Sequence, residues 1–192
     1  TAMESAGIPC IGVSTSKWDY DVLETYDQWI DLLSQVFPEE NKSQEVSDYS
    51  KEMYDMIQER VGSLSDEEKK EILFLYQYDD SQIVTSGKHF FGQFWAEAVG
   101  GKNAAEEVQA DNSNAVINME QVYTWDPDVV FITNFTAAMP DDLYNNELGN
   151  DWSSVKAVKD KAVYKMPLGS YRSFTPGTDT PVTLLWLAQK TY

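Results

Sequence analysis

Three short apolar runs, each of a length suited to a buried strand, are separated by segments with helical periodicity. The runs are 72–76 (ILFLY), 129–133 (VVFIT) and 162–166 (AVYKM). A continuous apolar run without polar alternation is typical of a strand that is buried on both faces of a parallel sheet. Parallel neighbours need crossover connections, so this order of runs predicts an α/β fold, a three-layer Rossmann-like unit with a mostly parallel sheet.

Helix signals lie between and before these runs. Residues 43–61 carry apolar side chains on one stripe with charged residues between them, and Gly62 is the expected end of this helix. Asp19 is the expected cap of an earlier helix, which Pro38 stops. The other expected elements are helices at 90–99, 118–125 and 152–158, a final helix from Thr180, and a loop at 77–87. Because regular alternation starts near residue 70, we expect a boundary there.

Residues 7–13 (GIPCIGV) predict a short buried strand near the beginning of the sequence. Cys10 lies inside it and is expected to be a packed core thiol. Since Cys10 is the only cysteine, no disulfide and no cysteine-held metal cluster can form within the chain.

The charge balance excludes several classes of partner. Acidic residues number 32 and basic residues 14, which gives a net charge of −18. Such a surface repels phosphate backbones and anionic lipid headgroups, so neither nucleic acid nor a membrane surface is an expected partner. The sequence also contains no GxGxxG motif and no P-loop, which argues against a nucleotide-binding enzyme of the Rossmann type.

Four stretches occur in an order that resembles a known family, the iron-siderophore and cobalamin type of periplasmic binding protein. The turn at 100–105 (GGKNAA) and the segment 117–128 (INMEQVYTWDPD) resemble two of its motifs. Residues 152–167 (WSSVKAVKDKAVYKMP) and 183–192 (TLLWLAQKTY) resemble two more. Residues 7–13 are similar to a strand near the end of the family's first lobe.

The resemblance implies a protein of two α/β lobes joined by one long helix. In that arrangement 1–42 is the incomplete end of the first lobe, 43–69 is the connecting helix region, and 70–192 is the C-terminal ligand-binding lobe. The family's other first-lobe strands carry half of the ligand cleft and are expected before Thr1. The chain alone is therefore not expected to close around a ligand.

The resemblance also implies a function. Members of this family bind a cargo between their lobes and present it to the permease of an ABC importer, without making or breaking its bonds. We therefore expect an extracytoplasmic solute-binding component, in the periplasm or lipid-anchored at the cell surface, that carries a ferric siderophore or similar iron chelate. The expectations include no enzyme activity, no cofactor besides the cargo, and a monomeric protein.

The ligand is expected at one edge of the sheet. Open α/β sheets bind ligands beyond the carboxyl ends of their strands, so the loops after residues 76, 133 and 166 are expected to share that edge. Tyr171 and Arg172 follow the last strand, where the family often places arginine or aromatic contacts. An arginine there can donate charge-assisted hydrogen bonds to an anionic chelate.

A second candidate group precedes the helix at 90–99. Lys88 and His89 lie at its N-terminus, where unpaired N–H groups favour anions. A subset of the family ligates ferric iron directly through His and Tyr, which makes His89 and Tyr171 a candidate pair of iron ligands. The competing interpretation of His89 is a capping or surface side chain.

Aromatic residues near strand ends complete the candidate set. Tyr78, Phe135 and Tyr76 follow or end their strands, and Trp18 and Tyr20 follow the expected first strand. They are candidates for walls of the ligand cleft, although aromatic residues near strand ends are also common in cores and rims.

Other functions stay open at this point. The same fold is compatible with cobalamin, haem or an oxyanion such as molybdate. A sugar-active hydrolase would need a supported acid and nucleophile, whereas the adjacent carboxylates Asp79 with Asp80 and Asp141 with Asp142 are expected to be solvated in polar loops. A metal-cluster or chelatase protein would need several cysteines or clustered histidines, and the chain has one of each.

Overall fold

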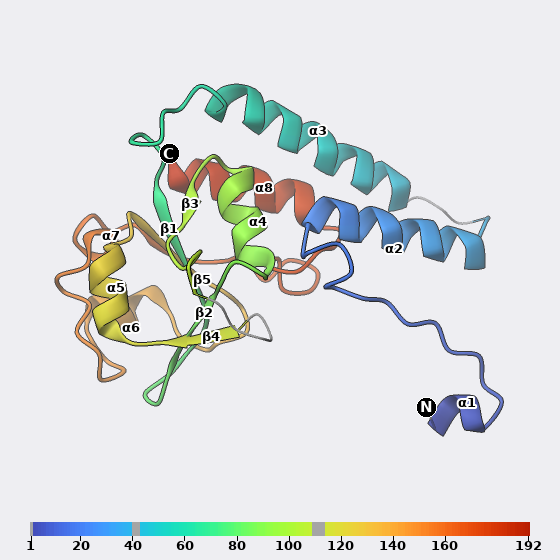
Figure 1. Ribbon diagram of the computed structural model, residues 1–192, viewed down its shortest axis with the longest axis horizontal. Coiled ribbons are helices and arrows are strands. Elements are labelled where there is room, and N and C mark those ends of the chain that lie inside the picture. Colours follow the sequence, from blue (N-terminus) through green and yellow to red (C-terminus); the bar gives the residue numbers. More distant parts are fainter. Residues whose placement is uncertain (1, 40–42, 109–113) are drawn as a thin grey trace.

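A computed structural model describes residues 2–39, 43–108 and 114–192. Within these ranges a six-stranded sheet lies at the centre, with helices on both of its faces (Figure 1). The strands are β1 (Glu71–Tyr78), β2 (Ile83–Ser86), β3 (Lys102–Asn103), β4 (Asn114–Ile117), β5 (Val129–Ile132) and β6 (Val163–Lys165). The helices are α1 (Ala2–Ser5), α2 (Val22–Val36), α3 (Ser43–Val61), α4 (Phe91–Ala98), α5 (Met119–Trp125), α6 (Pro140–Tyr144), α7 (Lys156–Lys159) and α8 (Thr180–Thr191).

The sheet has a parallel centre and an antiparallel side. Its order is β4-β2-β1-β5-β6, and β3 pairs with the beginning of β1. β5 runs parallel to β1 and to β6, whereas β2 is antiparallel to both β1 and β4. The predicted α/β class with a mostly parallel sheet is confirmed.

Alternate residues of β1 enter two separate cores, which makes the fold three-layered. Ile72 and Phe74 pack on one face, and Leu73 and Leu75 pack on the other. All four side chains are completely buried. The first face is covered by α2, α3, α4 and α8 through Val22, Ile57, Trp95 and Leu184, and the second by α5, α6 and α7 through Val122, Leu143 and Ala157. Burial on both faces is the reason that this run has no polar alternation.

The expected loop at 77–87 is wrong, because it contains a β-hairpin. β1 continues to Tyr78, which pairs with Ile83 at the beginning of β2. Asp79 closes the turn by accepting hydrogen bonds from two backbone N–H groups that follow it, at 2.9 and 3.1 Å. β2 has four residues, IVTS, too few for a clear apolar pattern in the sequence.

The helix expected at 43–61 is confirmed as one uninterrupted helix, α3. It packs against α8 and α2 (Figure 1). Asp27 of α2 accepts a hydrogen bond from Ser47 at 2.6 Å and lies 3.0 Å from the ammonium of Lys51. The Ser47 hydrogen bond is the main cause that lowers the pKa of the Asp27 carboxyl, and Lys51 adds to it while burial opposes it. The expected apolar stripe is only partly buried, since Tyr49 is 59% exposed.

The beginning of α2 differs from the expectation. Asp21 is the cap, and its side chain accepts a hydrogen bond from Glu24 N at 2.9 Å. Asp19, the expected cap, lies outside the helix with a φ of 50°, and Tyr20 follows with 60°. These left-handed conformations turn the chain before the helix starts.

Residues 7–13 do not form the expected strand. α1 and the coil after it extend away from the rest of the molecule (Figure 1). Ile11 and Val13 are 58% and 59% exposed, and Cys10 is exposed as well. The prediction of a packed thiol is therefore wrong for this structure, because the segment pairs with no strand in the part of the chain that the structure describes.

The GGKNAA stretch forms the expected helix stop and then a strand. Gly100 has a φ of 75°, and a Cβ there would meet the Val61 side chain at 2.5 Å, so α4 can end against α3 only at a glycine. Lys102 and Asn103 then form β3.

Two helices differ from the expectation on the other face of the sheet. α7 covers only Lys156–Lys159, the end of the helix expected at 152–158. α6 replaces the polar loop expected around Asp141 and Asp142, and the Asp142 carboxylate caps it by accepting a hydrogen bond from Met139 N at 2.7 Å. No helix among the described residues is long and apolar enough to cross a membrane.

Candidate functional site

The carboxyl ends of β1, β5 and β6 meet at one edge of the sheet. The Thr133 hydroxyl, just after β5, donates a hydrogen bond to Tyr76 O at 2.9 Å. The next residue, Asn134, donates from its side-chain amide to Met166 O at 3.0 Å. Tyr76 and the loops after residues 133 and 166 therefore share one edge, as the sequence predicts, whereas β1 continues past residue 76 into the hairpin.

Five aromatic rings gather at this edge, and we call them the edge cluster: Tyr20, Tyr76, Phe90, Phe135 and Phe174. The rings of Tyr76 and Phe135 are stacked, with centroids 4.6 Å apart. Phe90 meets Tyr76 edge-on at 5.3 Å and Tyr20 at 5.2 Å. Phe174 lies 5.8 Å from Phe90 and 6.1 Å from Tyr76. Phe174 is completely buried and the other four rings are partly buried, so the cluster forms an apolar floor that is assembled from five separate segments of the chain.

Arg172 lies over this floor. Its guanidinium carbon is 4.4 Å from the centre of the Phe135 ring and 5.4 Å from the centre of the Tyr171 ring. Tyr171 itself is 70% exposed. No hydrogen bond or ion pair of the guanidinium occurs within the described ranges, so its positive charge is held by aromatic rings and not by a carboxylate. Stacked guanidinium groups keep their N–H donors in the plane of the group, free to bind an anion.

Trp18, Lys88 and His89 form a second group beside the first. The ammonium of Lys88 is 3.6 Å from the carboxylate of Glu106, and His89 Nδ1 is 3.3 Å from the carboxylate of Asp19. Trp18 and Lys88 help to line a pocket of about 420 Å³. Both basic side chains of this group face an acid, in contrast to Arg172.

The N-terminus of α4 offers less to an anion than the sequence suggests. Gly92 N donates to the Ser86 hydroxyl at 2.9 Å, and Gln93 N donates to Phe90 O at 3.1 Å. Two amides of the first turn are therefore already satisfied within the protein.

Tyr78 belongs to the core and not to the ligand edge. It is 1% exposed, and its hydroxyl oxygen accepts hydrogen bonds from Trp152 Nε1 at 2.9 Å and from the Asn150 amide at 3.4 Å. The extension of β1 by two residues carries this ring under α6 and α7, away from the surface.

The candidate residues thus fall into two groups. Arg172, Tyr171 and Phe135 lie together, and His89 lies with Lys88 and Trp18. Phe90 follows His89 directly in the sequence, and its ring contacts Tyr20 and Tyr76. Because Tyr76 stacks on Phe135, Phe90 links the two groups. His89 and Tyr171, the candidate iron ligands, belong to different groups, and no cluster of three His, Cys, Asp or Glu suited to a metal ion occurs among the residues that the structure describes.

Lys165 is a feature of this edge that the sequence interpretation missed. Its ammonium donates hydrogen bonds to Thr133 O, Thr136 O and Ala138 O at 2.9, 2.7 and 2.9 Å. Burial lowers the pKa of the Lys165 amine below its ordinary value, and the nearby carboxylate of Asp142 opposes this shift. A lysine inside an apolar strand run, AVYKM, is the sequence signal that points to such a role.

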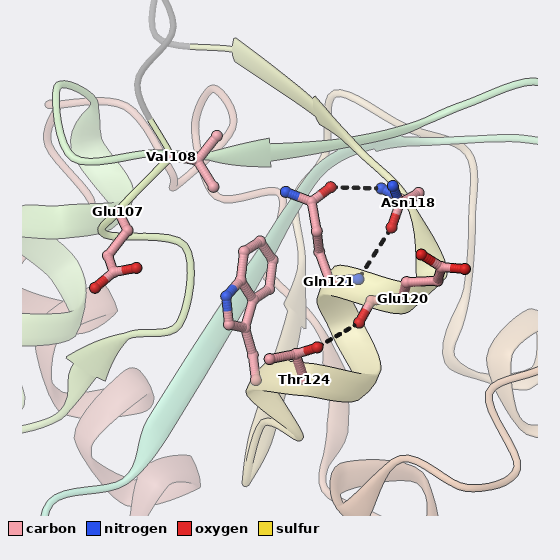
Figure 2. A pocket seen from close by; sticks show the side chains of 7 residues that line it. Glu107, Val108, Asn118, Glu120, Gln121 and Thr124 are labelled. Carbon is pink, nitrogen blue, oxygen red and sulfur yellow. Dashed lines mark hydrogen bonds between the residues drawn. The ribbon is translucent and has the colours of Figure 1, made fainter.

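A separate pocket of about 450 Å³ lies along α5 (Figure 2). Figure 2 shows that Asn118 and Gln121 form a capping box at the start of α5, each accepting a hydrogen bond from the backbone N–H of the other at 3.0 Å. Thr124 donates to Glu120 O at 2.8 Å. The charged side chains of this pocket are the carboxylates of Glu107 and Glu120, which disfavour an anionic ligand.

The fold agrees with the comparisons. Residues 3–168 match the model of the family described as periplasmic binding protein. The chain belongs to this family.

Two similar proteins are described as binding proteins. A Bacillus subtilis protein, the Fe(3+)-citrate-binding protein YfmC, is 28% identical to this periplasmic binding protein over 152 residues, which are 78% of this chain and 46% of the relative. The crystal structure of a periplasmic solute binding protein from Veillonella parvula is 30% identical, with a TM-score of 0.81, and the match covers 98% of this chain and 54% of that one.

A third similarity concerns the fold alone. The molybdate periplasmic binding protein MolA of Haemophilus influenzae is 18% identical, with a TM-score of 0.79, and the match covers 98% of this chain and 60% of that one. The present chain spans about half the length of the relatives that it matches.

Proposed function

We propose that this periplasmic binding protein is the extracytoplasmic solute-binding component of an ABC importer, and that its cargo is an anionic ferric chelate such as a ferric siderophore or ferric citrate. It binds the chelate reversibly, performs no chemistry on it, and delivers it to a membrane permease. The family assignment and the description of the Bacillus subtilis relative support this class of cargo.

The observation that carries the proposal is the state of Arg172. In a chain with a net charge of −18, this guanidinium lies at the ligand edge of the sheet over Phe135 and faces no carboxylate among the described residues. A cation that has no carboxylate partner among the described residues is suited to bind an anionic ligand. Carboxylate, catecholate and hydroxamate oxygens of a ferric chelate are such partners.

The edge cluster gives the proposed site its second property. Catecholate siderophores are large and carry aromatic arms around the charged ferric centre. Stacked rings such as Tyr76 and Phe135 bury such arms, while Arg172 binds the oxygens with charge-assisted hydrogen bonds. The exposed Tyr171 adds a hydroxyl and a second aromatic surface.

The second group, Trp18, Lys88 and His89, contributes less than Arg172 to the proposed site. Lys88 already forms an ion pair with Glu106, and His89 Nδ1 lies 3.3 Å from the carboxylate of Asp19. These two side chains therefore offer less to an anionic cargo than Arg172 does. In this proposal the chelator alone ligates the iron, and His89 and Tyr171 do not.

An oxyanion such as molybdate is the second candidate cargo, because the fold is shared with a molybdate-binding protein. The five rings of the edge cluster disfavour it, since a small hydrated oxyanion is bound through hydrogen bonds and has no apolar surface to bury. A hydrolase is disfavoured as well, because Asp79 closes a turn and Asp142 caps α6.

The test is a binding panel with the full-length protein as its gene encodes it. Ferric citrate and ferric enterobactin, which are both anionic, are titrated while tryptophan fluorescence is recorded, with the iron-free chelators, the non-anionic complex ferrioxamine, cobalamin, haem and molybdate for comparison. We expect saturable binding of at least one of the two anionic ferric complexes, with weaker binding of its iron-free form and of ferrioxamine, and recovery of the complex unchanged. Preferred binding of cobalamin, haem or molybdate would replace the proposed cargo, and turnover of the chelate would contradict a pure binding function.

A further inference from the structure

We infer that Lys165 is a positioning residue for the ligand edge, and that its ammonium holds segment 133–138 in the conformation that places Phe135 under Arg172. The inference deepens the proposed function and rests on it. Lys165 itself does not touch the cargo in this account.

The ammonium of Lys165 uses all of its hydrogen-bond donors within the protein. A lysine ammonium has three N–H donors and no acceptor, and Lys165 directs all three at main-chain carbonyls of one short segment. The three carbonyls belong to Thr133, Thr136 and Ala138, so the segment is wrapped around a single cation. Carbonyls that converge in this way repel one another unless a positive group lies between them.

Two further hydrogen bonds hold segment 133–138 against the neighbouring strands. The Thr136 hydroxyl donates to Tyr78 O at 2.7 Å, and the Asn134 amide donates to Met166 O at 3.0 Å. These bonds fix where the segment lies relative to β1 and β6. They do not satisfy the three carbonyl groups that Lys165 binds. Removal of the ammonium leaves partly buried acceptors unpaired, and the segment is expected to relax toward water.

Segment 133–138 reaches the proposed site through Phe135. Phe135 lies in the middle of segment 133–138, stacked on Tyr76, and it supports the guanidinium of Arg172 at 4.4 Å. Because side chains alternate along β6, Lys165 shares the face of Val163, which packs in the core under α5, α6 and α7. Phe135 packs with the opposite core. Lys165 therefore acts on the ligand edge from behind, through the backbone of the segment.

The experiment compares the wild type and four variants of the full-length protein by titration with ferric citrate and ferric enterobactin. The variants are Lys165→Met, Arg172→Ala, the double variant, and Lys102→Met as the matched control. Lys102 is also a strand lysine that donates to a main-chain carbonyl, Asp66 O at 2.8 Å, but it lies at the opposite edge of the sheet. Urea unfolding of each form separates a loss of stability from a loss of affinity.

The expected result is non-additive. Lys165→Met weakens binding about tenfold in the presence of Arg172, but less than about twofold in the Arg172→Ala background. The reason is that each substitution disrupts the same arrangement, in which Phe135 supports the guanidinium of Arg172. Lys102→Met leaves affinity unchanged. Additive losses, or an affinity of Lys165→Met equal to that of the wild type, overturn the inference.

Two further outcomes keep the inference separate from the proposed function. If Lys165→Met does not fold, Lys165→Gln, which keeps two N–H donors, takes its place; failure of both variants to fold makes Lys165 a residue of stability alone and overturns the positioning role. If the wild type binds neither ferric complex nor any other member of the panel, the proposed function fails first, and the inference fails with it.

Discussion

The indole N–H of Trp152 donates a hydrogen bond to the hydroxyl oxygen of Tyr78 at 2.9 Å, and both side chains are almost completely buried. Their rings meet edge-on with centroids 5.6 Å apart. The pair joins the end of β1 to the segment before α7. It also explains why a tyrosine at the end of a strand belongs to the core and not to the ligand edge.

Tyr78→Phe is expected to destabilise the protein without changing ligand affinity. The substitution leaves the buried indole N–H of Trp152 without its acceptor, which costs about 1–3 kcal/mol in the free energy of unfolding. Urea denaturation measures this loss. Tyr164→Phe is the matched control, since no hydrogen bond of the Tyr164 hydroxyl is found in the described part of the chain. A weaker affinity for a ferric chelate with unchanged stability would return Tyr78 to the ligand site.

Asp128, in the family-like "PD" motif, is a structural carboxylate at the other edge of the sheet. It accepts a hydrogen bond from Glu71 N at 2.9 Å, forms a short ion pair with Lys156, and lies 3.8 Å from the Lys70 ammonium. Burial opposes its ionisation, but the hydrogen bonds from Lys156 and Glu71 and the two positive charges outweigh burial, so the pKa of Asp128 is lowered overall.

The sign of its pH dependence follows from this shift. A carboxyl whose pKa is lower in the folded state contributes stability above its unfolded pKa of about 3.9, and the contribution is lost as the pH falls through the folded pKa. Asp128→Asn is therefore expected to lower the free energy of unfolding by about 1.5–3 kcal/mol near neutral pH, with a difference that shrinks below about pH 4. Urea denaturation at a series of pH values measures it. Asp66→Asn, in an exposed pair with Lys69, should show almost no effect, and a pH-independent deficit of Asp128→Asn would refute the assignment.

The backbone at Arg172 predicts a difference between two substitutions. Its φ of 51° lies in the left-handed region, where a Cβ costs about 1–2 kcal/mol and glycine has no such penalty. Arg172→Gly is therefore expected to unfold at a higher urea concentration than Arg172→Ala, although both lose the guanidinium and should bind a chelate equally poorly. Equal stability of the two variants would mean that the loop relaxes out of this conformation when the side chain is removed.

The elements that could be predicted are those whose structure depends on burial or on contacts between residues close in the sequence. Residues 72–75 and 129–132 are buried on both faces of the sheet, so their continuous apolar composition reflects the three layers. The capping box of Asn118 and Gln121 is a local contact over three residues and is visible in the sequence.

The elements that could not be predicted depend on partners far along the chain. β2 and β4 are four residues each and gain their stability from pairing. Residues 7–13 have the composition of a strand, but no strand pairs with them among the described residues, so composition alone misled. The division into 1–42, 43–69 and 70–192 stays a prediction, and Val22 and Ile57 are buried in the same core as Phe74.

The site was predictable in its place but not in its contacts. The position of Arg172 after a strand of a parallel sheet locates it at the carboxyl edge by topology alone. Its stacking on Phe135 joins residues from two different loops, and no local pattern records it. Lys165 escaped for the same reason, because its three acceptors lie in a loop about 30 positions earlier in the chain.

The most direct test of the account is the affinity of Arg172→Ala for the ferric chelate that the wild type binds, measured on the full-length protein by tryptophan quenching. Loss of a charge-assisted hydrogen bond should cost about 1.5–3 kcal/mol, which weakens binding about ten- to a hundredfold. Arg60→Ala, at the exposed end of α3, removes the other arginine of the chain and should leave affinity unchanged. His89→Ala should have a smaller effect than Arg172→Ala, because His89 already faces Asp19. If the wild type binds a ferric chelate tightly and Arg172→Ala binds it within about twofold of the wild type, the site does not lie at Arg172 and the central claim is contradicted.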